Sequence, residues 1–502
     1  MPPVMATRPT DLQRWDFLLP RGGWVDTHIP LGDPPGVTVL YNMRVSRDGL
    51  ETAPGWLQFF IQGFVSSPGE FKGIRTVTLP SGLTLTFVFF RTSIYMFNPE
   101  TTSLVDVTPT RSLMPEITDY APDVVYLNRK LYTVLSDGVY ELDPSVASPS
   151  FERIAGSPGG KAIGVLGFRL VVGNIVGGTG WDVVPYRIAW SGMNAPTTWD
   201  IAQTIDVPTY DPIIRFLPFG DVLLVITPNR FYTLSWTGSV VTPFAITFAA
   251  HIPSVITNPL QIQSIFLHDV KMVAYALHDG VYTFSGQESI LLNANIFNAY
   301  REMVSQHGVP LLGYDPESAE LWLYWLTADR AFVYQILFRS WYSRDYPSGA
   351  YLGLFNTSER PQARVMFVRM MTPTQLEFLR LRSSTDVDQR RGVLPFTAQV
   401  ITPVVEVGAV GGLKTTHSAI NWWTIFGQRA EVSGDIRMYA VVSNSLPILT
   451  TEQDWDEVGI LALSGEQEER GFNRTGRYMR FRFDFDGLTT RIVWHGFSVF
   501  WR

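Results

Sequence analysis

The histidines are the side chains most suited to bind a metal ion, but their spacing forms no local site. The chain has seven of them and no cysteine. No two stand in an H-x-x-x-H or H-x-H pattern, the spacings that let one helix or strand present two imidazoles to one Zn²⁺. Without cysteine there is no disulfide, thiolate metal site or cysteine nucleophile. The histidines are at positions 28, 251, 268, 278, 307, 417 and 495.

No other local motif for catalysis or cofactor binding occurs. The chain has no G-x-S-x-G elbow and no Walker loop. The stretch GGTGWD at 177–182 is rich in glycine, but it lacks the G-x-G-x-x-G spacing and a following helix, which favours a flexible loop. The sequence therefore predicts no catalytic residue, no cofactor and no metal, and we expect a protein that is not an enzyme.

Carboxylates and arginines could still act together if the fold gathered them. Five aspartates stand at the edges of expected strands, where turn formation is the commoner role. They are Asp211, Asp221, Asp269, Asp315 and Asp345. The stretch 359–391 holds seven Arg and four acidic residues, so it has a local positive excess. We interpret it as a solvated or subunit-facing surface rather than a substrate clamp.

The composition indicates which elements must position any such site. Hydrophobic residues make up 46% of 502 residues and charged ones only 17%, so a large core can form. The 15 Trp and 32 Phe occur together with 34 Pro and 41 Gly. This mixture favours many short strands joined by tight turns, and we predict an all-β chain of more than one domain.

Charge and hydropathy limit the partners. The start of the chain has no continuous apolar core of the signal-peptide kind, and no run of 18 apolar residues occurs, so we expect no membrane association. The formal net charge is −7 and is spread through the sequence. Tight non-specific DNA binding needs several Lys or Arg on one face, so this charge argues against a groove that grips phosphates. It does not argue against DNA that passes without binding.

A hairpin pattern recurs along the chain. SDGVYELD at 136–143 returns as HDGVYTFS at 278–285, each after an apolar run, and a turn dipeptide between period-2 apolar segments is typical of a β-hairpin. Seven such hairpins occur at intervals of 44 to 52 residues. The first large residues after their turns are Tyr95, Tyr140, Ile188, Tyr232, Tyr282, Tyr334 and Phe378. A period of this length with about four strands per unit predicts a β-propeller of about seven blades.

The ends of the repeat are less regular. Residues 39–56 either begin an eighth blade or close the ring by pairing with the last blade. The stretch 293–308 has apolar residues at spacings of one, three and four, which predicts a short amphipathic helix between blades. We divide the chain into an N-terminal arm with a first hairpin (1–56), a propeller (57–385) and a C-terminal domain (386–502).

The hairpin repeat does not continue into the C-terminal domain. A polar stretch at 382–392 fits a linker. RYMRFRFDF at 477–485 alternates strictly, with Phe481, Phe483 and Phe485 on one side and Arg480 and Arg482 on the other. That alternation predicts a half-buried strand. At least four further strand candidates follow residue 390, so we predict a β-sandwich-like domain.

Three segments resemble a known family. WVDTHIPLGDPPGVTVLYNMRVSRDGLETAPGW (24–56) is similar to the Pro-rich arm that opens the nozzle proteins of short-tailed bacteriophages, although Ala53 stands where the arm usually has Arg. These proteins are also called tail tubular protein B or packaged-DNA stabilisation proteins. YRIAWSGMNAPTTWD (186–200) resembles their recurring blade segment. TGRYMRFRFDFDG (475–487) and IVWHGFSVFWR (492–502) resemble their C-terminal strands.

The resemblance implies a structural protein of the viral tail. It implies a homohexameric tube of propellers around an axial channel, docked beneath the tail adaptor protein and contacting tail fibres or a tail needle. Genomic DNA would be retained in the channel and conducted through it during ejection, without specific binding. The implied location is the virion tail, assembled in the host cytoplasm, with no membrane in the mature tail.

A glycan-binding or glycan-cleaving propeller is the alternative. Sialidases carry an S-x-D-x-G-x-T-W turn, which SRDGLET (46–52) and NAPTTWD (194–200) do not match. Trp181, Trp190 and Trp199 cluster in one blade and could stack on sugar, although Trp in a blade is more often core. For a gate of the channel, the expected loops at 173–185 and 251–261 are the candidates, and deletion of 174–184 is expected to leave folding intact and release packaged DNA.

Overall fold

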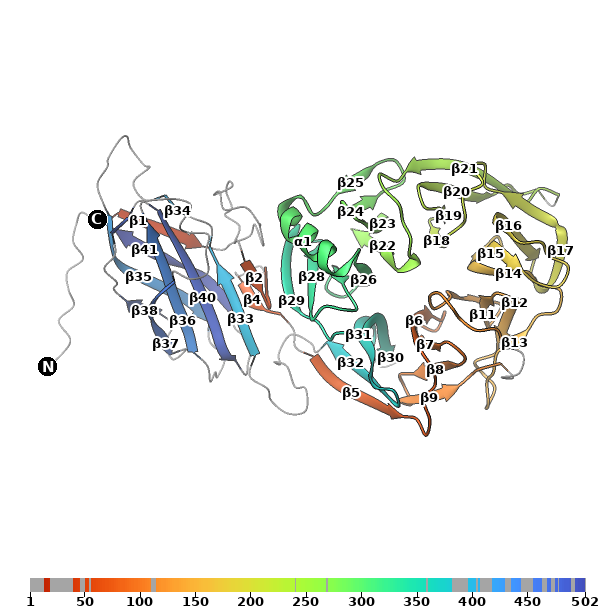
Figure 1. Cartoon of the computed structure of the whole chain (residues 1–502), viewed down its shortest axis with the longest axis horizontal. Helices are drawn as coiled ribbons and strands as arrows, with labels where there is room; N and C mark the ends of the chain where they lie inside the picture. Colours follow the sequence, from red (N-terminus) through yellow and green to blue (C-terminus); the bar gives the residue numbers. More distant parts are fainter. Residues whose placement is uncertain are drawn as a thin grey trace.

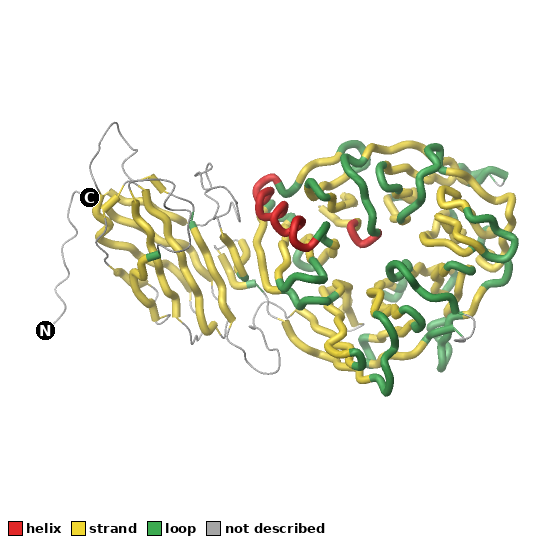
Figure 2. The backbone as a smooth tube through the Cα atoms, in the orientation of Figure 1, coloured by secondary structure: helices red, strands yellow, loops and turns green. Residues whose placement is uncertain are grey.

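The computed structural model shows a ring of four-stranded sheets joined side by side to a second all-β domain (Figure 1). It describes residues 13–18, 39–45, 50–53, 56–109, 114–239, 241–267, 270–357, 360–381, 396–402, 405–406, 418–428, 435–443, 455–462, 467–470, 475–476, 478–488 and 493–501. Among these residues, helix is confined to three short elements (Figure 2). None of the described helices is both long and apolar enough to cross a membrane.

Blades 1 to 4 are consecutive antiparallel meanders, each a separate sheet. Blade 1 comprises β6 Phe71–Thr78, β7 Thr84–Phe90, β8 Ile94–Asn98 and β9 Ser103–Asp106. Blade 2 comprises β10 Val124–Leu127, β11 Lys130–Leu135, β12 Gly138–Leu142 and β13 Glu152–Arg153. Blade 3 comprises β14 Gly159–Leu166, β15 Arg169–Gly177, β16 Val184–Gly192 and β17 Ala195–Asp206. Blade 4 comprises β18 Arg215–Phe219, β19 Val222–Ile226, β20 Arg230–Trp236 and β21 Phe244–His251.

Blades 5 to 7 complete the ring. Blade 5 comprises β22 Ile262–Leu267, β23 Val270–Leu277, β24 Gly280–Phe284 and β25 Ser289–Leu291. Blade 6 comprises β26 Leu311–Asp315, β27 Glu320–Tyr324, β28 Arg330–Gln335 and β29 Ser340–Asp345. Blade 7 comprises β30 Tyr351–Thr357, β31 Arg360–Thr372 and β32 Gln375–Leu381, and its fourth strand is β5 Trp56–Gly63 from the other end of the chain.

The propeller prediction is confirmed, with one difference in how the sheets are divided. Each predicted hairpin joins the second and third strands of a blade, as in the hairpin of β11 and β12, where Tyr140 of β12 pairs with Thr133. Six blades are separate four-stranded sheets. Blade 6 is not separate, because β2 Val39–Tyr41 pairs in parallel with β29 and extends it into a ten-stranded sheet. The expectation of an eighth blade at 39–56 is wrong. The ring is closed by β5, which pairs with β32 of the last blade and begins at Trp56.

The continuous apolar runs of the middle strands follow from burial on both faces. All seven residues of β7 are buried. Phe87 and Phe89 belong to the core between blades 1 and 2, whereas Val88 and Phe90 belong to the core between blades 1 and 7. Because successive side chains of a strand point to opposite faces, one strand serves two inter-blade cores.

The predicted helix is confirmed. It follows η2 Ala294–Ile296 as α1 Phe297–His307, between blades 5 and 6. Ile296, Tyr300 and Val304 are buried against blades 5 and 6. The helix ends at Gly308, whose φ of 79° lies in the left-handed region that favours glycine. Its role is packing, because its apolar side lies in the largest core of the molecule.

Strands from both ends of the chain form the second domain. The far part of the ten-stranded sheet comprises β2, β33 Phe396–Ile401, β34 Val405–Glu406, β36 Asp435–Ser443, β37 Asp456–Ala462 and β40 Tyr478–Leu488. A seven-stranded sheet comprises β1 Gln13–Leu18, β3 Met43–Val45, β4 Leu50–Thr52, β35 Ser418–Gln428, β38 Gln467–Arg470, β39 Thr475–Gly476 and β41 Val493–Trp501. Two all-β sheets agree with the sandwich-like prediction. On β40, Phe481, Phe483 and Phe485 are fully buried as predicted, but Arg480 is buried as well.

The N-terminal hairpin attaches the second domain to blade 6. Gln335 of β28 accepts a hydrogen bond from the Val45 amide and donates one to the Val45 carbonyl, both at 3.0 Å. Arg44 of β3 pairs with Glu51 of β4 at 2.7 Å and with Glu320 of β27 at 3.2 Å. These polar contacts come from the four strands β3, β4, β27 and β28, so several interactions fix the geometry of the junction.

Candidate functional site at the propeller axis

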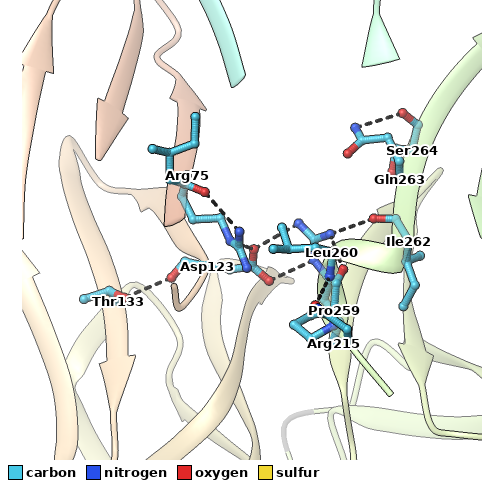
Figure 3. A network of polar contacts seen from close by, with 11 residues as sticks. Arg75, Asp123, Thr133, Arg215, Pro259, Leu260, Ile262, Gln263 and Ser264 are labelled. Atoms are coloured by element: carbon cyan, nitrogen blue, oxygen red, sulfur yellow. Dashed lines mark hydrogen bonds and ion pairs between the residues drawn. The ribbon is translucent and has the colours of Figure 1, made fainter. Parts of the chain in front are cut away.

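A buried ion network joins blades that are not neighbours in the ring. Asp123, just before β10, accepts hydrogen bonds from Arg215 of β18 at 3.0 Å to each carboxylate oxygen. Its Oδ1 also lies 2.8 Å from Nε of Arg75 on β6. Blade 3 separates blades 2 and 4 in the ring, so the pair formed by Asp123 and Arg215 spans the inner side of that blade (Figure 3). The network therefore ties inner strands together around the axis.

Backbone groups complete the coordination of this network. Arg215 donates from Nη1 to the carbonyl oxygens of Pro259 and Ile262, at 3.0 and 2.8 Å. Pro259 begins η1 Pro259–Gln261, the turn that leads into blade 5. Thr133 of β11 donates to the Asp123 carbonyl at 3.0 Å. Groups from blades 1, 2, 4 and 5 thus converge on one carboxylate and one guanidinium (Figure 3).

The electrostatics favour the charged form of the carboxylate. Burial by itself opposes ionisation of Asp123, but the guanidiniums of Arg215 and Arg75 outweigh it and lower the pKa of this carboxyl below its ordinary value. Burial lowers the pKa of Arg75, an effect that Asp123 partly offsets. A bidentate arginine–carboxylate pair is among the strongest and most directional polar contacts in proteins. The network therefore fixes the spacing of the inner strands.

A pocket of about 410 Å³ opens beside the network. Its walls come from the connections between blades, at 116–123, 212–214 and 255–259, and from the start of β14. That strand approaches blade 2 closely, since a Cβ at Gly159 would collide with the Ser136 carbonyl. The apolar lining consists of Ile117, Ala121, Pro122, Val134, Leu135, Val176, Pro212, Ile213, Ile214, Pro228, Val255, Ile256 and Pro259.

The acidic side chains of this pocket are all neutralised by partners. Asp123 is held by its two arginines, and Asp119 pairs with Lys161 at 2.5 Å across the rim. Glu116 pairs with Arg91 at 2.6 Å. The charges of the carboxylates that line this pocket are thus balanced by arginine and lysine side chains.

The four described aspartates of the five singled out from the sequence do not form one site. Asp211 pairs with Arg230 at 2.8 Å, and Asp221 lies in the turn of the hairpin between β18 and β19. Asp315 is buried and accepts the Glu317 amide at 3.0 Å, a turn contact. The Tyr41 hydroxyl and the Asn42 side-chain amide donate to Asp345. Asp269 lies outside the described residues.

The three tryptophans of blade 3 belong mainly to the core. Trp181 and Trp190 are 8% and 6% exposed. Trp181 donates its indole N–H to the Gly156 carbonyl at 3.0 Å, and Trp199 donates to the Pro196 carbonyl at 2.9 Å. Buried rings leave no flat face for a sugar, so the packing interpretation holds for Trp181 and Trp190.

Of the two expected gate loops, the stretch 173–185 is partly strand, whereas 251–261 is mostly a connection between blades. The prediction of a loop at 173–185 is wrong at both ends, because 173–177 belongs to β15 and 184–185 to β16. Trp181 anchors the remainder, so the expectation that deletion of 174–184 leaves folding intact is not supported by the packing. The stretch 251–261 does form a connection after β21, and Val255, Ile256 and Pro259 line the axial pocket. Whether either stretch gates a channel stays a prediction.

No group of three or more His, Asp or Glu in the described part of the chain could hold a metal ion. His28, His268 and His417 lie outside that part. Sequence reasoning missed the axial network altogether. The only feature of the sequence that could have indicated this network is the presence of an arginine in an apolar strand. Arg75 stands in FKGIRTVT, and Arg215 stands directly before FLPF. A charge in such a position needs a buried partner, but the sequence does not say which carboxylate supplies it.

Comparisons with known proteins give neither a family nor an activity for this chain. No family model and no curated protein matches the chain. Among solved structures, the WD40 domain of Pan2 from Neurospora crassa is 9% identical over 65% of this chain and 96% of its own, with a TM-score of 0.41. Virginiamycin B lyase from Staphylococcus aureus is 10% identical over 64% of this chain and 99% of its own, again with a TM-score of 0.41.

Proposed function

We propose that this chain is a structural subunit of a bacteriophage tail, a nozzle protein that retains packaged DNA and conducts it during ejection as a homohexamer. The proposal rests on the sequence resemblance of both chain ends and of 186–200. One structural observation supports it: the resembling ends are built into one unit. Strand β4 from the N-terminal segment pairs with β41 from the C-terminal segment, with Leu50 opposite Trp494.

The axial network bears on where DNA would pass. Asp123 and Arg215 join blades 2 and 4 on the inner side of the ring, next to Arg75. We therefore do not place the DNA on the propeller's own axis. Each propeller would instead form part of the wall of the channel. The conduit would then be the space enclosed by six subunits, and the net charge of −7 per chain would keep phosphates from adhering to its surface.

The mass of the assembled protein tests the proposal. Purified protein or disrupted virions examined by native mass spectrometry and negative-stain microscopy are expected to give rings of six. A protein that stays monomeric and cleaves a chromogenic glycoside would instead support the glycan alternative. The two outcomes use the same preparation, so the experiment separates the two classes of function.

A further inference from the structure

The outermost strands of the blades differ in how they expose their free edges. The outer strand of blade 6 is covered by β2, and those of blades 1, 2 and 5 are only four, two and three residues long. Three outer strands are long: β17 with twelve residues, and β21 and β5 with eight each. Within the described strands, β21 pairs only with β20, and β5 pairs only with β32. Among the described strands, their outer edges therefore have no partner strand.

Two of these edges lack the charges that normally prevent pairing. The sequence of β21 is FAITFAAH and that of β5 is WLQFFIQG, so neither contains Lys, Arg, Asp or Glu. The third, β17, carries Asp200 and Asp206. Soluble proteins usually protect a long edge with a charge, a proline or a covering element, because a bare edge pairs with another chain. Strands β21 and β5 contain no charge and no proline, and no strand in the described part of the chain covers their outer edges.

Each of the two edges also exposes a large apolar side chain. Phe248 of β21 is 48% exposed, and Ile61 of β5 is 43% exposed. An aromatic residue opposite an aliphatic one is a favourable cross-strand pair. The two strands lie on opposite sides of the ring, and the second domain lies beside blade 6 (Figure 1). One chain therefore carries two different edges of equal length that face away from each other.

We infer that β21 of one subunit pairs with β5 of the next and that this strand pairing is the contact between propellers in the assembly. The inference rests on the proposed function, in which six copies form a ring. A contact between two different surfaces is heterologous. When each subunit is rotated by one sixth of a turn relative to the last, repetition of such a contact gives a closed ring of six. Pairing of β21 with β21 would instead give a two-fold dimer, which cannot extend to six through that edge alone.

Cysteine cross-linking tests which edges meet, because the chain contains no cysteine of its own. A variant with both Ile61→Cys and Phe248→Cys, treated with a short bismaleimide, is expected to give a ladder of covalent oligomers up to six. Each single variant is expected to give monomer only. Covalent dimer from Phe248→Cys alone would overturn the inference in favour of a two-fold contact. Rings of six that do not cross-link in the double variant would also overturn it, while leaving the proposed function intact.

Charge placed on the edges provides a second measurement. Ile61→Lys and Phe248→Lys are each expected to weaken assembly at least about tenfold in sedimentation at matched concentrations. Val146→Lys is the control, because Val146 is equally exposed at 48% but lies between β12 and β13. Its assembly is expected to match that of the unmodified protein. Equal assembly of all three variants would overturn the inference, whereas the absence of any hexamer in the unmodified protein would refute the proposed function instead.

Discussion

Replacement of Asp123 by Asn tests whether the axial network holds the blades together. The substitution keeps the shape of the side chain and removes the charge between Arg215 and Arg75. Those guanidiniums have side chains only 15% and 8% exposed, so water compensates them little. Removing one partner of a buried ion pair typically costs about 3–5 kcal/mol, because it leaves an uncompensated buried charge. We expect Asp123→Asn to lower the free energy of unfolding by this amount.

The matched control is Asp119→Asn on the rim of the same pocket. Asp119 and its partner Lys161 have side chains 53% and 52% exposed, so solvent screens the pair. Exposed pairs contribute about 0–1 kcal/mol, and the control is expected to fall in that range. Urea unfolding and calorimetry are used together, because a chain of two domains can unfold in more than one transition. If Asp123→Asn costs no more than Asp119→Asn, the network does not fix the inner strands.

A second substitution separates lost charge balance from lost packing. Addition of Arg75→Met to Asp123→Asn removes one unpaired guanidinium and leaves Arg215 with its two carbonyl acceptors. The double variant is expected to be more stable than Asp123→Asn alone. A double variant that is less stable would mean that Arg75 contributes mainly through packing of its stem.

The pH dependence of stability tests whether the pKa of Asp123 is lowered in the folded protein. The pKa of Asp123 is lowered in the fold, so its contribution is present above the unfolded value of about 3.9 and is lost as pH falls through the folded value. The stability difference between the unmodified protein and Asp123→Asn should therefore be constant near neutral pH and shrink in acid. A difference that grows in acid would contradict this assignment.

The remaining predictions concern single buried groups. Burial, together with the charge of Glu320 on the facing strand, raises the pKa of Asp315 to about 7, so ionisation destabilises the fold increasingly between about pH 4 and pH 7. Asp315→Asn is expected to be more stable than the unmodified protein at pH 8 and equal to it near pH 4 in urea unfolding; identical curves at pH 8 would contradict this. Trp181→Ala should cost about 3–5 kcal/mol because a buried ring leaves a cavity, whereas Met193→Ala, 50% exposed in the same blade, should change stability by less than about 0.5 kcal/mol. Deletion of 174–184 should lower the thermal midpoint, since it removes part of β15; an unchanged midpoint would show that the segment is dispensable.

Local sequence patterns are sufficient to predict the all-β class, the seven hairpins and the helix at 297–307. These features depend on local rules: alternation of apolar residues, turn dipeptides, and helical spacing ended by Gly308. Local patterns are readable because each is satisfied within a few residues of the chain. For the same reason the alternation on β40 predicted the buried faces of Phe481 and Phe483.

The contacts between distant segments are visible only in the folded chain. Closure of blade 7 by β5, extension of blade 6 by β2, and the meeting of Arg215 with Asp123 join residues about 90 to 320 positions apart. An apolar strand can pair with many others of similar composition, and a buried arginine can be neutralised by any carboxylate that the fold delivers. Such choices depend on the free energy of the whole packed ring, which no short stretch of sequence contains.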